Sequence, residues 1–157
     1  MIEIKNFSRS YGALTAVDNI DLKIDTGMVF GLLGPNGAGK STTVKTLTGA
    51  IKPSAGEIYI NGINLQTEPL KAKQQIGYVP EHPTVFKNLT GKEYLFMAGK
   101  LYQIESPRLA SHVGQLLSRF GLQEKANEQI LSYSKGMVQK LVIAAALIHN
   151  PSVLILD

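Results

Sequence analysis

Residues 31–43 read GLLGPNGAGKSTT and hold the most informative spacing in the chain. Gly34 is followed by four residues and then by Gly39, Lys40 and Ser41, which satisfies the P-loop pattern for binding phosphates. Glycines let the backbone N–H groups of such a loop curl around phosphate oxygens, and a helix beginning near Gly39 adds the positive end of its dipole. A glycine-rich turn that binds nothing is the alternative, and the apolar run directly before the loop argues against it. The stretch therefore predicts an α/β fold built around a phosphate-binding loop.

The segments around this loop have the patterns of β-strands. Residues 1–7 (MIEIKNF) and 20–24 (IDLKI) alternate apolar and polar side chains, and residues 56–65 place an Asn-Gly pair between two alternating halves. Alternation predicts half-buried strands, and the Asn-Gly pair predicts a hairpin turn. Residues 28–34 (MVFGLLG) are apolar on both faces, which predicts a strand covered on both sides of a sheet. Residues 74–80 (QQIGYVP) predict a further strand that ends at its proline.

After about Pro83 the apolar spacing changes to that of helices. Thr90 and Glu93 form the sequence signature of a capping box, which opens a first helix. Ser106-Pro107 opens a second helix, which Gly121 ends. A third helix is predicted from Ser134 to about His149, and its apolar centre predicts burial on all sides.

Asp157 closes a second apolar run, VLIL at 153–156, which predicts a buried strand that delivers an acid to the site. In P-loop proteins such an acid and the hydroxyl that follows the loop lysine hold the Mg²⁺ of a bound nucleotide, and the lysine bridges the outer phosphates. An ordinary strand-end acid is the alternative for Asp157, and the P-loop upstream disfavours it. The predicted catalytic residues are Lys40 and Asp157. The predicted nucleotide-contacting residues of the loop are Gly34, Pro35, Asn36, Gly37, Ala38, Gly39, Lys40, Ser41 and Thr42.

The composition limits the class of protein. The chain has 157 residues, of which 44% are hydrophobic and 18% charged, a balance typical of a globular domain. It has no cysteine, which excludes disulfides and thiolate metal sites and is typical of a reducing cytosol. The net charge is +4 and no two Lys or Arg residues are adjacent, so no nucleic-acid partner is expected. The longest apolar run, at 141–148, is far shorter than the ~20 residues of a membrane span.

Four stretches together resemble the nucleotide-binding subunit of ATP-binding cassette (ABC) transporters. They are residues 11–49 (YGALTAVDN and onward through the P-loop, the Walker A motif), 53–65 (PSAGEIYINGINL), 76–81 (IGYVPE) and 131–157 (LSYSKGMVQK and onward to the strand-end Asp of Walker B). The motifs occur in the family's order over essentially the whole chain. The resemblance implies a P-loop NTPase fold with a β-rich edge and a helical insert, as one incomplete domain over 1–157. It divides that domain into a core at 1–81, a helical part at 82–150 and a return strand at 151–157.

The resemblance also implies site residues that spacing alone does not give. Tyr11 matches the aromatic that stacks on adenine, and Glu81 sits where the family usually has a Mg²⁺-contacting glutamine. Ser134 and Gly136 match the signature motif, which acts in trans on the nucleotide of a second cassette in a head-to-tail dimer. Without the family, Tyr11 reads as a half-buried strand tyrosine, Glu81 as a solvated loop acid and Ser134 as a helix N-cap.

The chain departs from the family pattern at the signature. The usual Leu-Ser-Gly-Gly-Gln reads Tyr133-Ser134-Lys135-Gly136-Met137 here, so Lys135 adds a cation and Met137 lacks an amide. Glu81 in place of glutamine adds a negative charge near the metal. Both departures resemble cassettes that serve export-type permeases, many of which export drugs or antibiotics.

The function that the resemblance implies is ATP hydrolysis that powers transport, in the direction of export, through a separate integral-membrane permease. ATP and Mg²⁺ are the implied cofactors, and the implied location is the cytoplasmic face of the cell membrane. The loop at 81–90 and the helical insert are expected to dock on the permease. Two alternatives stay open: a soluble ABC-type ATPase of translation or DNA repair, and a nucleotide-binding module without turnover. The family places a catalytic glutamate just after Asp157 and a histidine further on, so these 157 residues alone are expected to bind nucleotide without sustained hydrolysis. His82, His112 and His149 are expected to be structural or solvated.

Overall fold

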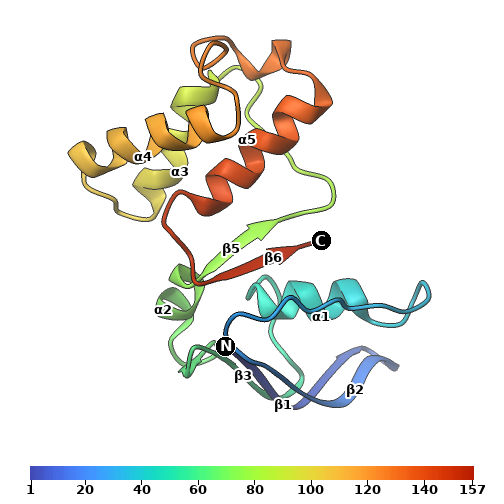
Figure 1. Cartoon of the computed structure of the whole chain (residues 1–157). Coiled ribbons are helices and arrows are strands. Elements are labelled where there is room, and N and C mark those ends of the chain that lie inside the picture. Colours follow the sequence, from blue (N-terminus) through green and yellow to red (C-terminus); the bar gives the residue numbers. More distant parts are fainter. The chain divides into compact units, whose positions relative to one another are not determined.

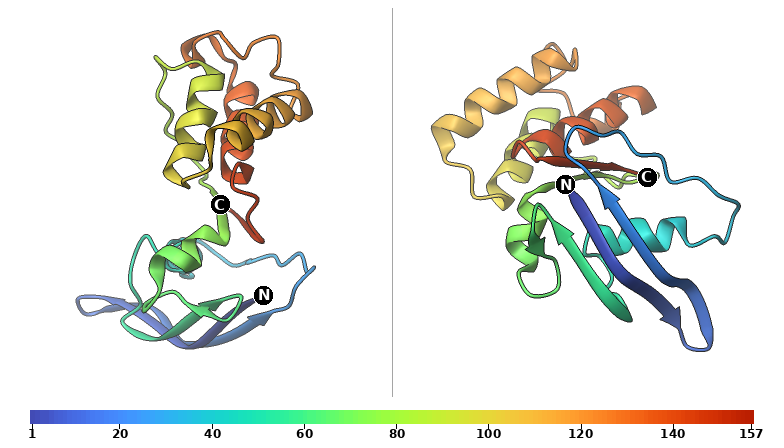
Figure 2. Two further views of the ribbon diagram at one scale, coloured as in Figure 1. Left: turned by 90° about the vertical axis from the view of Figure 1, so that its left-hand side faces the viewer. Right: turned by 60° about the horizontal axis from the view of Figure 1, so that its bottom comes forward.

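The computed structural model describes all 157 residues and divides them into two compact units. Residues 1–76 together with Asp157 form the first unit, and residues 77–156 form the second, which we call the helical unit. Figure 1 labels their helices and strands, and Figure 2 gives two further views. None of the helices combines the length and the apolar character that a membrane span requires.

The first unit is built on an antiparallel sheet of four strands in the order β2-β1-β3-β4. The strands are β1 (Ile2–Tyr11), β2 (Leu14–Ile24), β3 (Ala55–Ile60) and β4 (Ile63–Asn64). Both neighbours of Ile4 in the register, Leu22 on β2 and Ile58 on β3, are apolar. The predicted hairpin turn is confirmed, since Asn61 and Gly62 both have positive φ (50° and 79°), as a two-residue turn of this kind needs.

Two helices complete the first unit, α1 (Lys40–Leu47) and α2 (Pro69–Gln74). α1 lies over the sheet (Figure 1) and buries Thr43, Thr46 and Leu47. The prediction that a helix follows the P-loop is therefore confirmed. Sequence patterns did not predict α2, because its six residues are too few to show a helical period, although Pro69 at its first position is a helix-start signal.

The prediction of a strand at residues 28–34 is wrong. The segment has no regular secondary structure, and Val29 (103% exposed) and Leu33 (91% exposed) lie in the open. A strand exists only through hydrogen bonds to neighbouring strands, and none of the six strands in the chain pairs with this segment. The segment has the apolar composition of a buried strand, but composition does not show whether another strand pairs with it.

The helical unit packs three helices, α3 (Gly91–Leu101), α4 (Ser106–Arg119) and α5 (Lys135–Leu147), around one hydrophobic core. A short 3₁₀ helix, η1 (Ile130–Ser132), leads into α5. The predicted helices are all confirmed, and so is the burial of the centre of α5, where no residue from 141 to 148 is exposed. Gly99 lets α3 and α4 approach closely, since a Cβ there would meet the Leu109 side chain.

Strands β5 (Ile76–Val79) and β6 (Val153–Leu156) pair with each other in a sheet of two. The predicted strands at 74–80 and 153–156 are confirmed as strands. The predicted burial of the second is wrong at two of its four positions, because Leu154 and Leu156 are exposed. Leu154 and Leu156 lie on one face of β6 and Ile155 on the other, so only one face of the strand is covered.

Candidate nucleotide-binding site

The P-loop is shaped by glycines with left-handed backbone. Gly37 and Gly39 have φ of 84° and 83°, a region that other residues rarely adopt. Gly39 is also the N-cap of α1, and a Cβ there would lie 2.5 Å from the Ala16 carbonyl oxygen on β2. This position therefore requires glycine twice, for its conformation and for its contact with the sheet. The loop turns directly into α1, whose first N–H groups have no partner within the helix.

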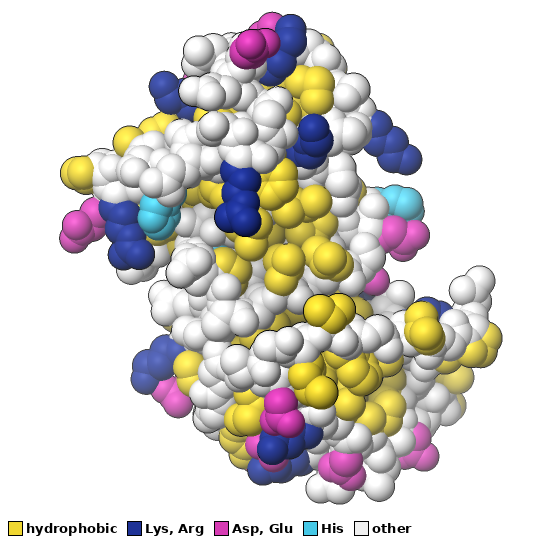
Figure 3. Space-filling view, viewed as in Figure 1, with side chains coloured by type: hydrophobic (Ala, Val, Ile, Leu, Met, Phe, Trp, Pro, Cys, Tyr) yellow, Lys and Arg dark blue, Asp and Glu magenta, His cyan; other side chains and the backbone are white.

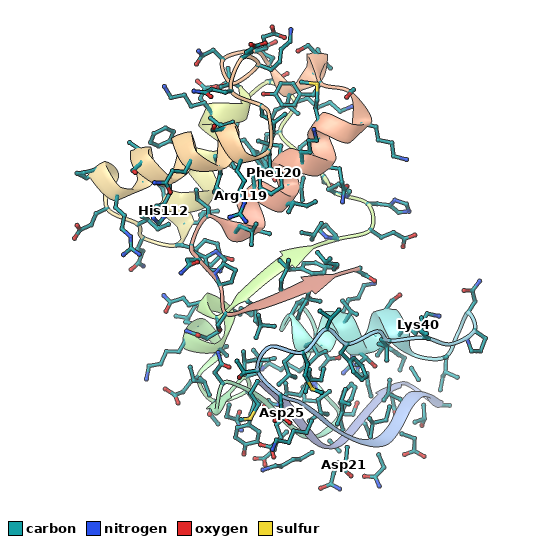
Figure 4. All side chains as sticks on the ribbon, viewed as in Figure 1. Asp21, Asp25, Lys40, His112, Arg119 and Phe120 are labelled. Atoms are coloured by element: carbon teal, nitrogen blue, oxygen red, sulfur yellow. The ribbon has the colours of Figure 1, made fainter.

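Lys40 lies at the start of α1 (Figure 4), and its ammonium group points back into the loop. Its Nζ donates hydrogen bonds to the carbonyl oxygens of Gly34 (2.7 Å) and Pro35 (2.8 Å). The Ala38 N–H donates to the same Pro35 oxygen (3.2 Å), so the loop curls around the lysine. The loop thus presents a cation and the positive end of a helix at one place, which is the electrostatic requirement for a polyphosphate.

The hydroxyl groups on α1 divide into internal and outward-facing ones. Thr43 and Thr46 are buried and donate to the carbonyl oxygens of Gly39 (2.9 Å) and Thr42 (2.8 Å). Ser41, in contrast, is exposed in the first turn. Ser41 therefore has the position expected of a residue that offers its hydroxyl to a ligand.

Tyr11 ends β1 and is 45% exposed. Hydrogen bonding by the Thr42 side chain lowers the pKa of the Tyr11 hydroxyl, and hydrogen bonding and charge from Arg9 lower it further. The fold therefore brings the predicted base-stacking residue beside the first turn of α1, which follows the phosphate loop. A half-buried strand tyrosine, the alternative for Tyr11, also fits its place at the end of β1 and its partial exposure.

The predicted metal-binding residues carry hard oxygen donors, which is the ligand chemistry of Mg²⁺. Ser41 and Asp157 are exposed and belong to the first unit, whereas Glu81 belongs to the helical unit, where its carboxylate lies 3.8 Å from His82 Nε2. No group of three His, Cys, Asp or Glu side chains gathers anywhere in the chain. Nucleotide-bound Mg²⁺ takes one or two carboxylates beside phosphates and waters, and Asp157 and Ser41 of the first unit offer a carboxylate and a hydroxyl of this kind.

The predicted signature residues lie at the start of α5. The Ser134 side chain accepts a hydrogen bond from the Met137 N–H (3.3 Å), so the N-cap interpretation of Ser134 is confirmed. Gly136 is exposed, and a Cβ there would meet no atom within 4 Å. The N-terminus of a 13-residue helix therefore faces outward beside Lys135, which is exposed too.

Two residues that sequence patterns missed hold these sites in place. Arg9 lies over the Tyr11 ring, with its Cζ 4.6 Å from the ring centroid. Tyr133, directly before the N-cap of α5, is buried and donates to the Lys125 carbonyl oxygen (2.7 Å). The two-residue spacing of Arg9 and Tyr11 on one strand is a signal that could have identified the first pair. The Tyr133 contact depends on tertiary packing and has no local signal.

Backbone hydrogen bonds join the loop after Glu81 to the segment before the signature. The Ile130 N–H donates to the Leu89 carbonyl oxygen (2.9 Å), and the Leu131 N–H donates to that of Lys87 (3.0 Å). We call this pairing of residues 87–90 with 129–131 the loop bridge. The two segments are therefore fixed to each other within the helical unit.

The histidines have the surroundings expected of structural or solvated residues. His112 on α4 (Figure 4) has its Nδ1 3.2 Å from the Ile148 carbonyl oxygen. The His149 ring stacks on Tyr102 with centroids 3.6 Å apart. His82 is exposed beside Glu81.

Comparisons with known proteins identify the family. Residues 17–157 match the family model described as ABC transporter. The linearmycin resistance ATP-binding protein LnrL of Bacillus subtilis (strain 168) is 38% identical over 157 residues, which are 100% of this chain and 50% of that protein. The daunorubicin resistance ATP-binding protein DrrA3 of Streptomyces coeruleorubidus is 35% identical over 99% of this chain and 49% of that protein.

A solved structure described as the ATP binding subunit of an ABC transporter has a TM-score of 0.90 and 34% identity. It covers 99% of this chain, which in turn covers 65% of that chain. The likeness confirms the predicted P-loop NTPase fold. The chain spans about half the length of the curated relatives it matches. Because the family model matches most of its residues, this chain belongs to the ABC transporter family.

Proposed function

We propose that this chain is the nucleotide-binding part of a subunit that hydrolyses ATP to power export through a separate membrane permease. The observation that carries the proposal is the P-loop geometry, in which Lys40 points into a glycine loop at the N-terminus of α1. The resistance proteins among its relatives support the direction of export. The family's location would place the subunit on the cytoplasmic face of the membrane.

The residues of the first unit have distinct parts in this function. Lys40 would exchange the carbonyl oxygens of Gly34 and Pro35 for oxygens of the outer phosphates, while the N–H groups of the loop and first turn donate to the remaining ones. Tyr11 would stack on the base. Bound Mg²⁺ would neutralise phosphate charge, and the residues of the first unit that would hold it are Ser41 and Asp157.

The exposed start of α5 would act on the nucleotide of a second copy. Ser134 and Gly136 present a helix N-terminus with no side chain blocking it, and Lys135 adds a cation beside it. This is an arrangement that attracts a phosphate from outside the chain. A head-to-tail dimer, in which each signature closes on the other copy's nucleotide, would use it.

The permease would dock on the helical unit around the loop at 81–90. Phe86 in this loop is 63% exposed and would offer an apolar side chain to the permease. The loop bridge would pass a displacement of this loop to the start of α5. On the face shown in Figure 3, Lys and Arg side chains are scattered rather than gathered in one patch, which favours a protein partner over a nucleic acid.

The substitution Lys40→Ala tests the site. It removes the cation that the loop surrounds, so we expect ATP affinity in the presence of Mg²⁺ to fall by at least about tenfold and hydrolysis to be lost. Lys100→Ala is the control, because Lys100 is an exposed lysine of α3 in the helical unit and is not among the nucleotide-site residues. Both variants are measured in a protein that contains the whole cassette. Equal ATP affinity for the parent and Lys40→Ala would contradict the proposal.

A further inference from the structure

Arg9 makes a contact with Tyr11 that the roles of the P-loop do not require. Its guanidinium Cζ lies 4.6 Å from the centroid of the Tyr11 ring and over its face. An aromatic ring has two faces, and each accepts one flat or cationic partner. Arg9 therefore covers one face of Tyr11, so a base can stack only on the other.

The guanidinium group of Arg9 is itself held by a hydrogen bond to another segment of the chain. Its Nη1 donates to the carbonyl oxygen of Lys52 (3.0 Å), in the connection between α1 and β3. Its Nε is buried and has no hydrogen-bond partner in the chain. Arg9 thus joins the tip of β1 to the segment that follows the P-loop helix.

The Tyr11 hydroxyl lies near groups that favour its ionised form. The Thr42 side chain and Arg9 both lower the pKa of Tyr11, and the charge of Lys45 adds to this effect. The contact that restrains the ring is the one with Arg9, whose guanidinium lies over its face and is held by the Lys52 carbonyl oxygen. A ring restrained in this way loses little freedom when a base stacks on it, which is the benefit of preorganisation.

We propose that Arg9 is a positioning residue for base recognition, which covers one face of the Tyr11 ring and turns the opposite face toward the nucleotide. The proposal rests on the nucleotide-binding function proposed above. It assigns Arg9 an effect on the base and none on the phosphates, because Arg9 contacts the stacking residue and not the loop.

The chain contains a matched pair for comparison. Lys5 Nζ lies over the Tyr59 ring, 4.9 Å from its centroid. This contact too joins a cation of β1 to an aromatic residue. Tyr59 lies on β3, and neither residue belongs to the nucleotide site. Lys5→Met therefore removes a cation–π contact of the same kind from the same sheet.

The experiment compares two ligands in a protein that contains the whole cassette. ATP probes the base and the phosphates together, whereas inorganic triphosphate probes the phosphates alone. We expect Arg9→Met to weaken ATP binding roughly fivefold and to leave triphosphate binding unchanged. Arg9→Lys, which keeps the charge, should recover part of the loss, and Lys5→Met should bind both ligands as the parent does.

A spectroscopic measurement separates positioning from a general structural role. The chain has no tryptophan, so Tyr11→Trp introduces a reporter whose emission is quenched when a base stacks on it. Adding Arg9→Met to that variant should reduce the quenching at saturating ATP. In the parent background, Arg9→Met should raise the pKa of Tyr11, identified by comparison with Tyr11→Phe.

Three outcomes would overturn the proposal. One is an unchanged ATP affinity in Arg9→Met, and another is an equal loss of ATP and triphosphate, which would indicate damage to the loop. The third is a parent protein that binds triphosphate but whose ATP affinity equals that of Tyr11→Ala, which would show that no base stacks on Tyr11. A parent that binds neither ligand would reject the nucleotide function, and this proposal with it.

Discussion

Gly39 shows how one residue connects the sheet to the phosphate loop. Its backbone starts α1 in a left-handed conformation, and its missing side chain makes room for the Ala16 carbonyl group of β2. Gly37 has almost the same φ, but a Cβ there would meet no atom within 4 Å. Comparing the two glycines therefore distinguishes the energetic cost of a left-handed backbone, which both positions share, from the cost of a steric clash, which only Gly39 has.

We predict that Gly39→Ala destabilises the protein more than Gly37→Ala. Both variants force alanine into the left-handed region, at a cost of roughly 1–2 kcal/mol. Only Gly39→Ala adds a clash with a backbone oxygen at 2.5 Å. Thermal unfolding of the two variants beside the parent measures the difference. Equal shifts in Tm would show that β2 yields to the added methyl group.

The capping box shows how an element's first turn depends on pH. The Thr90 hydroxyl accepts a hydrogen bond from the Glu93 N–H (3.1 Å), and the Glu93 carboxylate accepts one from the Thr90 N–H (2.8 Å). The Thr90 backbone N–H and then its hydroxyl lower the pKa of Glu93 below its usual value. Because the folded pKa is the lower one, the ionised carboxylate stabilises α3 at any pH above the unfolded value of ~4.3.

We therefore predict that the helical unit loses stability as the pH falls from about 4.3 through the lower pKa of folded Glu93. Glu93→Gln keeps an acceptor for the Thr90 N–H but cannot titrate, so its free energy of unfolding should change less over the same range. Urea unfolding between about pH 3 and 6 measures both proteins. Parallel curves for the parent and the variant would exclude Glu93 as a source of the pH dependence.

At the scale of the whole molecule, the proposed dimer places the P-loop and the signature of each site on different copies. Lys40→Ala should inactivate a site through its P-loop, and Gly136→Asp through the opposing signature. The aspartate has free space, since a Cβ at Gly136 meets nothing within 4 Å, but its charge would repel phosphate. Each variant should therefore fold and be inactive alone.

We predict that mixing the two variants restores part of the ATP hydrolysis. In a mixed dimer one site combines both substitutions, and the other combines an intact P-loop with an intact signature. In a protein that contains the whole cassette, phosphate release is measured for each variant alone and for the mixture at equal total protein. A mixture as inactive as its components would contradict the head-to-tail arrangement, provided that exchange of subunits is confirmed by differently tagged copies.

The residues that the sequence placed correctly are those with local causes. The P-loop spacing, the Asn61-Gly62 turn and the Thr90 capping box each act within a few residues, and the structure confirms their geometry. Residues 28–34 failed as a predicted strand because pairing depends on distant segments. The Arg9–Tyr11 contact was missed for a related reason: strand spacing puts the two residues on one face, but the hydrogen bond from Arg9 to the Lys52 carbonyl oxygen, which holds the guanidinium, joins distant segments.

The hydrogen bonds of Lys40 to its own loop have a consequence for anion selectivity. An ammonium group has three N–H donors, and two of them are satisfied by the Gly34 and Pro35 carbonyl oxygens. An incoming anion must therefore outcompete two neutral dipoles that are already in place and cost no entropy to bring there. A single negative charge, as on chloride or acetate, gains little from that exchange in water, whereas the several charges of a polyphosphate gain from the cation and the helix end at once. We therefore expect the loop to bind polyphosphates in preference to the monovalent anions of a cell.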